Sequence, residues 1–175
     1  ELVRLAAHAA DRVVAQIAAG RLVGRTEADV AAEVRTRLLA EGHEEASFAI
    51  VGSGPNSASP HHEASERVIG AGEPIVLDIG GSLGGYGSDI TRTLWVTGGD
   101  ATKGPDERFR HLFNVLFHAQ AAATRAVAPG VACAAIDAAA CRACGGGGSL
   151  PRPGNRRSSS GARRGARSAR RPRAW

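Results

Sequence analysis

The sequence predicts an α+β fold in which helices pack on one face of an antiparallel sheet. Two helical patterns open the 175-residue chain, a group of β-prone segments follows them, and helical patterns return afterwards. This order favours a layer of helices on a sheet, and the length is enough for one domain with a real core.

Two helices precede the first strand. The segment "ELVRLAAHAADRVVAQIAAG" places apolar residues at helical spacing and is closed by Gly20. The second segment, "TEADVAAEVRTRLLAEG", begins at Thr26, which forms with Asp29 a pattern like a capping box with Asp in place of Glu. Gly42 is the stop signal of this second helix.

Three strands are predicted next. "ASFAIVGSG" is the first, and "PNSASPHHEAS" is a loop rich in turn residues. "EPIVLDI" and "GYGSDITRTLWV" form a hairpin across a glycine-rich turn. A third helix is expected from about residue 105 to 127, and a short helix restarts after Pro129-Gly130. The apolar face of the third helix comprises Phe109, Leu112, Phe113, Leu116 and Ala119.

The formal net charge of +5 belongs to the end of the chain. Nine arginines and no acidic residue lie between Arg152 and Trp175, which leaves 13 basic against 17 acidic residues before them, a net charge of −4. We therefore predict a domain over residues 1–144 and a disordered Arg/Gly/Ser/Pro-rich tail over 145–175, because the tail has too few apolar residues to offset the cost of ordering. A frameshifted reading of a GC-rich gene is a hypothesis for this abrupt change.

The tail also raises the alternative of a nucleic-acid-binding protein, because clustered arginines neutralise phosphate. No aromatic residue separates these arginines before Trp175, so stacking on bases is unsupported. Nucleic-acid binding is thus expected only non-specifically.

The cysteines and the two ends of the chain say less about the function than the helices and strands do. Cys133, Cys141 and Cys144 are odd in number, which argues against a disulfide framework, and we treat them as small buried or incidental residues. The chain begins at Glu1 and contains no Met, as expected of a fragment or a processed product. It has neither a secretory leader pattern nor an apolar run of about 20 residues, so a cytoplasmic protein without membrane contact is predicted.

The stretch "VLDIGGSLGGYGSDITRT", residues 76–93, places two aspartates in the hairpin. If the turn is centred between Leu83 and Gly84, then Asp78 faces Asp89 across the strands, with Cβ atoms roughly 4.5–5.5 Å apart. Like charges there repel, unless one carboxyl is protonated or a cation lies between them. Hard divalent cations prefer carboxylate oxygens, so a metal is predicted. The alternative is a register shifted by one, with at least one aspartate in solvent.

Three segments carry a resemblance to a known family: "SGPNSASPHH" at 53–62, "GEPIVLDIGG" at 72–81 and "GYGSDITRT" at 85–93. Together they resemble the pita-bread metallopeptidases, specifically the Xaa-Pro dipeptidase (prolidase) and aminopeptidase P branch, and more distantly methionine aminopeptidase. The resemblance covers roughly residues 1–144. It implies the pita-bread, or creatinase/aminopeptidase-like, fold, truncated after its first half.

The resemblance also implies roles for individual residues. Asp78 and Asp89 match the first two ligands of a dinuclear centre, in which Asp89 bridges two Mn²⁺ or Co²⁺ ions that share the attacking hydroxide. His61 matches the catalytic histidine that lines the substrate pocket and hydrogen-bonds the scissile peptide, and His62 is the less favoured of the pair. Thr91 and Arg92 are assigned to structure, Arg92 at most to an ion pair behind the ligands.

The chain departs from the family pattern in its last part. The family uses one further His and two Glu ligands, but no His, Asp or Glu follows Cys144. The resemblance thus implies a peptidase acting on proline-containing peptides, a homodimer when intact, with an incomplete site and no activity in this chain. A non-catalytic pita-bread binding module is the alternative, and the intact aspartate pair disfavours both it and the metal-free creatinase.

Overall fold

The computed structural model describes residues 1–145. The chain divides into two compact units, Glu1–Phe113 and Asn114 onward, and each is described by itself. None of the helices within the described residues has the length and apolarity that crossing a membrane would require.

Two helices open the first unit, as predicted. Helix α1 spans Leu2–Ala19 and helix α2 spans Glu27–Ala40. The capping box at the start of α2 is confirmed: the Thr26 hydroxyl accepts the Asp29 amide at 3.0 Å, and the Asp29 carboxylate accepts the Thr26 amide at 3.2 Å. These paired bonds satisfy two amides that the helix itself leaves free, and they fix where α2 begins.

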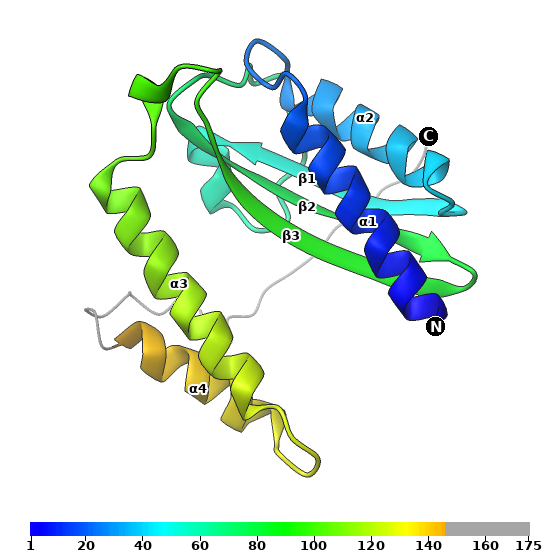
Figure 1. Cartoon of the computed structure of the whole chain (residues 1–175), viewed down its shortest axis with the longest axis vertical. Coiled ribbons are helices and arrows are strands. Elements are labelled where there is room, and N and C mark those ends of the chain that lie inside the picture. Colours follow the sequence, from blue (N-terminus) through cyan, green and yellow to red (C-terminus); the bar gives the residue numbers. More distant parts are fainter. Residues whose placement is uncertain (146–175) are drawn as a thin grey trace, which may run out of the picture. The chain divides into compact units, whose positions relative to one another are not determined.

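The sheet has three antiparallel strands in the order β1-β2-β3 (Figure 1). Strand β1 spans Glu45–Ser53, β2 spans Glu73–Leu83 and β3 spans Tyr86–Val96. A short 3₁₀ helix, η1 (Gly54–Ala58), follows β1, and another, η2 (Ala101–Lys103), follows β3. The predicted strands and their antiparallel pairing are therefore confirmed.

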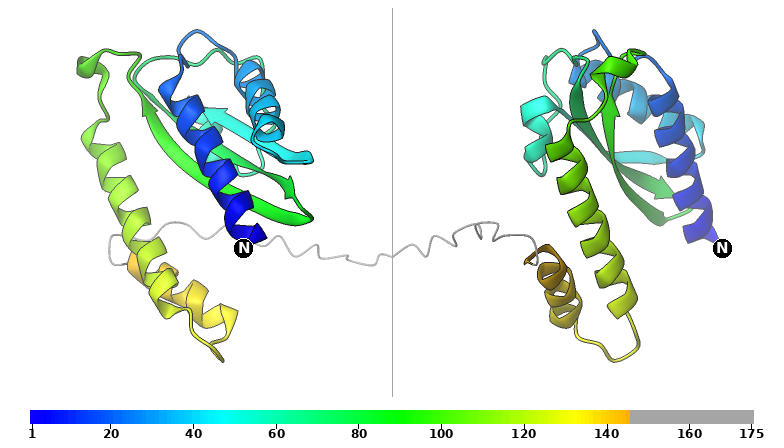
Figure 2. Two further views of the ribbon diagram at one scale, coloured as in Figure 1. Left: turned by 45° about the vertical axis from the view of Figure 1, so that its right-hand side comes forward. Right: turned by 60° about the vertical axis from the view of Figure 1, so that its left-hand side comes forward.

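Helices α1 and α2 both lie over one face of the sheet (Figures 1 and 2). Along β2 the alternate residues Ile75, Leu77 and Ile79 are fully buried on this side. They join the apolar stripes of the helices in one core, as the sequence predicted. The other core members include Val13, Ile17, Val30, Val34, Leu38 and Val51. The opposite face of the sheet, which α1 and α2 do not cover, carries Asp78.

Helix α3 spans Glu107–Ala126 and begins in the first unit, where Phe109 packs against Trp95 with ring centroids 4.7 Å apart. In the second unit the rest of α3 is followed by α4, Cys133–Gly145. Both helices were predicted.

Part of the apolar face predicted for α3 is exposed. Leu112, Phe113 and Leu116 are open to solvent, whereas Ala119 is buried. The regular apolar spacing predicted the helix correctly. It did not predict which apolar side chains of the helix are buried by other described residues.

The three cysteines are free. Cys133 and Cys141 are exposed, so the idea that these are small buried residues is wrong for both. Helix α4 includes Gly145. The rest of the predicted tail lies outside the described residues, and so do the disorder and the non-specific nucleic-acid binding predicted for it.

Candidate functional site

The two predicted metal ligands lie on the same face of the β2–β3 hairpin. Asp78 falls between the buried residues Leu77 and Ile79, so strand alternation turns it to the side away from α1 and α2. Asp89 lies on β3 and shares this side, because its partner on β2 is Gly80, two residues from Asp78. The fold thus brings the carboxylates together, as the sequence predicted.

The predicted register is wrong. Asp78 pairs with Thr91, and Asp89 pairs with Gly80, so the aspartates are diagonal neighbours and do not face each other directly. The reason is the turn, which is centred between Gly84 and Gly85 and not one residue earlier. Both glycines have positive φ, +60° and +77°, which suits a two-residue hairpin turn. Residues that are diagonal neighbours in an antiparallel pair lie roughly 7–8 Å apart, compared with roughly 4.5–5.5 Å between the Cβ atoms of directly opposed residues.

The structure agrees with the alternative of a shifted register and an aspartate in solvent. Asp78 is half-buried, but Asp89 is exposed. Solvent therefore weakens the repulsion between the two charges, so the hairpin does not require a cation in order to form. What remains is a pair of carboxylates on an open face.

Thr91 is a site residue whose role the sequence reasoning missed. Its hydroxyl donates to Asp78 Oδ1 at 2.8 Å from the directly opposite position on β3. This bond holds one carboxylate oxygen in place, and the other accepts no hydrogen bond from residues 1–145. The signal was present, because Thr91 follows Asp89 by two residues and so shares its face.

Arg92 lies on the other side of the sheet from the aspartates. It pairs with the buried Leu77, and its guanidinium reaches Asp11 of α1 at 3.2 Å. Both side chains of this ion pair are half exposed, so it contributes little to stability. Arg92 is structural, as predicted, but its ion pair is not one that supports the metal ligands.

Phe48 lies beside the aspartates on the uncovered face. A Cβ added at Gly80 would lie 2.6 Å from the Phe48 ring and 2.2 Å from the Ser88 carbonyl oxygen. Only glycine therefore fits at the position opposite Asp89. The close approach packs an aromatic ring next to the carboxylates.

His61 lies in the loop after η1 and is exposed. Its φ is +57°, in the left-handed region that residues other than glycine seldom adopt. It lines a pocket of about 450 Å³ together with Phe48 and Ile50 of β1. Ile50 is in turn the β1 partner of Asp78, so the fold places His61 beside the strand that neighbours the metal ligands.

His62 points into the protein instead. Its Nε2 lies 2.8 Å from Oε2 of Glu27, a carboxylate without solvent exposure. Burial raises the pKa of Glu27, but hydrogen bonds from His62, Ser53 and Ser65 outweigh it and lower that pKa from 4.5 to about 2. Sequence reasoning overlooked Glu27, since a Glu in the first turn of a helix is usually a solvent-exposed helix-stabilising residue.

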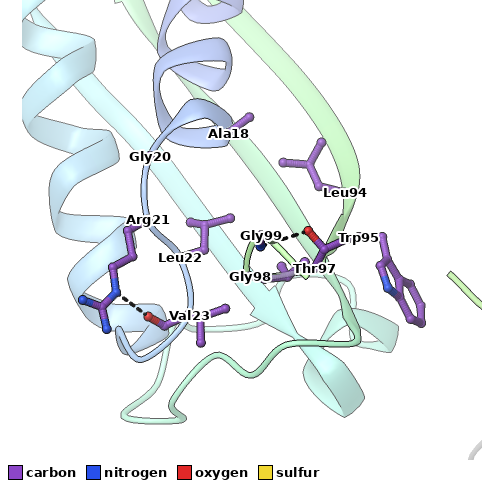
Figure 3. Close-up of a pocket in the computed structure, with 11 residues that line it drawn as sticks. Ala18, Gly20, Arg21, Leu22, Val23, Leu94, Trp95, Thr97, Gly98 and Gly99 are labelled. Atoms are coloured by element: carbon purple, nitrogen blue, oxygen red, sulfur yellow. Dashed lines mark hydrogen bonds between the residues drawn. The ribbon is translucent and has the colours of Figure 1, made fainter. Parts of the chain in front are cut away.

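A second pocket lies apart from these residues, between the loop after α1 and the end of β3 (Figure 3). Its walls include Leu22, Val23 and Leu94, and the Arg21 Nε donates to the Val23 carbonyl at 3.1 Å. None of the predicted site residues line it.

The donor set fits part of a metal site. Two carboxylates on an open face suit a hard divalent cation. Among residues 1–145, however, no group of three or more His, Cys, Asp or Glu side chains lies close enough together to hold one. Asp78 and Asp89 could therefore bind an ion strongly only with ligands from elsewhere.

Comparison with known proteins shows to which family the chain belongs. The sequence profile of Metallopeptidase family M24 matches residues 1–158. The chain belongs to metallopeptidase family M24. The probable dipeptidase PepE of Mycobacterium tuberculosis is 45% identical to this chain over 141 residues, which cover 80% of this chain and 36% of the relative. The Xaa-Pro dipeptidase of Pyrococcus furiosus is 34% identical over 141 residues, 80% of this chain and 39% of the relative.

Solved structures agree with the assignment to M24. The dipeptidase PepE from Mycobacterium ulcerans superposes with a TM-score of 0.77 at 42% identity, covering 83% of this chain and 38% of that one. The prolidase from Pyrococcus furiosus gives 0.77 at 32% identity, covering 84% and 42%. The predicted α+β pita-bread fold is confirmed. The chain spans about 40% of the length of the relatives that it matches.

Proposed function

We propose that this chain forms the first part of a metal-dependent peptidase that hydrolyses the bond between an N-terminal residue and proline. The observation that carries the proposal is the pair Asp78 and Asp89 on one uncovered sheet face, in a chain of a metallopeptidase family. Similarity to proteins named Xaa-Pro dipeptidase supports the choice of substrate. A peptide would lie along this face, which α1 and α2 leave free.

Each residue has a distinct proposed role. Asp78 and Asp89 would hold two divalent ions, Mn²⁺ or Co²⁺. When bound, such ions supply an activated water and polarise the peptide carbonyl. Thr91 would fix the rotamer of Asp78 through its 2.8 Å hydrogen bond, which leaves the second oxygen free for an ion.

His61 would orient the substrate from the adjoining loop. Its exposed imidazole shares a pocket with Phe48 and Ile50, next to the strand that carries Asp78. From that place the ring can hydrogen-bond the peptide group that is cleaved, and the two apolar side chains can contact the flanking residues. The backbone at His61 is held in a left-handed conformation, which is typical of functional loops.

The chain alone is proposed to be inactive. No His, Asp or Glu follows Cys144, so the later ligands implied by the family resemblance are not in this sequence. Two carboxylates leave most of the coordination sphere of each ion unfilled. A homodimer and a cytoplasmic location for a protein of the relatives' full length stay predictions.

The test uses this chain alongside a form extended to the length of its relatives. The extended form should cleave an Xaa-Pro dipeptide only after Mn²⁺ or Co²⁺ is added, and residues 1–175 should not. Asp89→Asn should lower kcat/KM by more than the roughly 10–100-fold expected for losing a residue that only supports a ligand. His61→Ala should cost less, because it removes no metal ligand. Full activity after exhaustive chelation would refute the proposal.

The Thr91 hydroxyl gives a finer prediction. In the extended form, Thr91→Val should raise the Mn²⁺ concentration for half-maximal activity by about tenfold, because Asp78 loses the donor that orients it. Thr93→Val is the matched control, since Thr93 lies on the same face but opposite Val76. Equal metal requirements in both variants would contradict the role given to Thr91.

A further inference from the structure

The carboxylate of Glu27 accepts several hydrogen bonds in the first unit. It lies in the first turn of α2 and has no solvent exposure. Four residues donate to it: Ser53 through its amide at 2.7 Å and its hydroxyl at 2.9 Å, Asn56 at 3.1 Å, His62 at 2.8 Å, and Ser65 through its hydroxyl at 2.7 Å and its amide at 3.2 Å. A buried carboxylate with this many donors is a fixed structural charge.

The donors come from both ends and the middle of one segment, residues 53–65. This segment has a single 3₁₀ turn, η1, and no strand pairing between residues 59 and 65. The backbone near Glu27 adds to the attachment, because the Ala28 amide donates to the Ser65 carbonyl at 3.0 Å. The segment therefore depends on α2, and above all on Glu27, for its conformation.

His61 and His62 differ in exposure. The His62 ring is largely buried and lies against Glu27, while His61 is exposed. Both residues line the pocket beside Phe48 and Ile50, and only His61 of the two has a left-handed backbone. Because such a conformation is unfavourable for a residue other than glycine, its surroundings must hold it in place.

We propose that Glu27 and His62 are positioning residues for His61: the buried carboxylate holds the His62 ring, and this contact keeps the neighbouring His61 in its left-handed conformation, in the pocket beside β1. The inference rests on the proposed function only for the role of His61. The anchoring itself is a property of the chain without substrate or metal.

The contact has a spectroscopic signature. An ionised carboxylate only accepts hydrogen bonds, so Nε2 of His62 must carry a hydrogen. The ¹⁵N signal of this nitrogen should be that of a protonated ring nitrogen held in one tautomer.

The experiment compares two variants of the full 175-residue chain. His62→Leu removes the donor to Glu27, whereas His62→Gln places an amide N–H where Nε2 was. Histidine-selective ¹⁵N labelling reports the tautomer of His62, whose signals are identified because they are missing from the spectra of both variants. Amide hydrogen exchange over residues 59–65 reports the order of the segment, and thermal melting reports the rest of the fold.

We expect His62→Leu to speed exchange over residues 59–65 by at least about tenfold, because a hydrogen bond to a charged group is lost, with melting of the core nearly unchanged. His62→Gln should restore protection. Unchanged exchange in the Leu variant, equal loss in both variants, or a His62 Nε2 without hydrogen would overturn the proposal. These readouts need no catalysis, so failure of the proposed function and failure of this proposal are distinguishable.

Discussion

Replacing Gly80 by alanine should destabilise the fold by about 3 kcal/mol, at the upper end of what overpacking costs. The new methyl group would lie 2.2 Å from the backbone oxygen of Ser88 and 2.6 Å from the Phe48 ring. The ring can rotate, but the backbone oxygen belongs to the paired strand and can move only if β3 shifts. The same shift would displace Asp89, the partner of Gly80, relative to Asp78.

Gly87→Ala is the matched control for this change. Gly87 lies in the same hairpin, and a Cβ added there would meet nothing within 4 Å. Urea unfolding of both variants, followed by circular dichroism, gives the difference in the free energy of unfolding. If Gly80→Ala proved as stable as Gly87→Ala, the close approach of the Ser88 carbonyl and the Phe48 ring to Gly80 would be wrong.

Acidification from about pH 6 to about pH 2 should remove about 3 kcal/mol of stability through Glu27 alone. The folded state lowers the pKa of Glu27 from 4.5 to about 2, since donors from His62, Ser53 and Ser65 outweigh the effect of burial. A lowered pKa means that the unfolded chain binds the proton more readily. The contribution is therefore present above about pH 4.5 and is lost as the pH falls towards 2.

Glu27→Gln isolates this effect from other carboxylates whose pKa is also lowered, such as Glu33 and Glu41. At pH 6 the variant should be less stable than the parent, because a neutral amide cannot accept all the donors that surround it. The gap should close as the pH falls to about 2, when Glu27 itself becomes neutral. A gap that stays constant across this range would count against an ionised Glu27 in the folded chain.

The order of helices and strands follows from the sequence because the local signals agree with the global packing. Thr26 and Asp29 form the predicted capping box, and the alternation around Ile75, Leu77 and Ile79 matches the buried face. The register of the hairpin does not follow as readily. Several glycines occupy the turn, and the choice of Gly84-Gly85 over its neighbours depends on backbone twist and not on side-chain pattern.

The candidate site was predictable where it lies on strands and not where it depends on a loop. Period-two alternation placed Asp78 and Asp89 on one face even with the wrong register, because an error of one residue in the turn centre changes the sum of paired positions by two. Glu27 and His62 are 35 positions apart, and no periodic pattern links them. Only the path of residues 53–65 brings them into contact.

The two-residue turn at Gly84-Gly85 also determines when the aspartate pair forms. Asp78 and Asp89 are joined by local pairing alone, and such hairpins close in about 1–10 μs. An isolated hairpin is only marginally stable, but α1, α2 and β1 all precede this one in the chain and are synthesised before it. During synthesis, therefore, the apolar side of the hairpin can be covered as soon as Val96 has left the ribosome, and the carboxylates can reach their final spacing before any later residue has emerged.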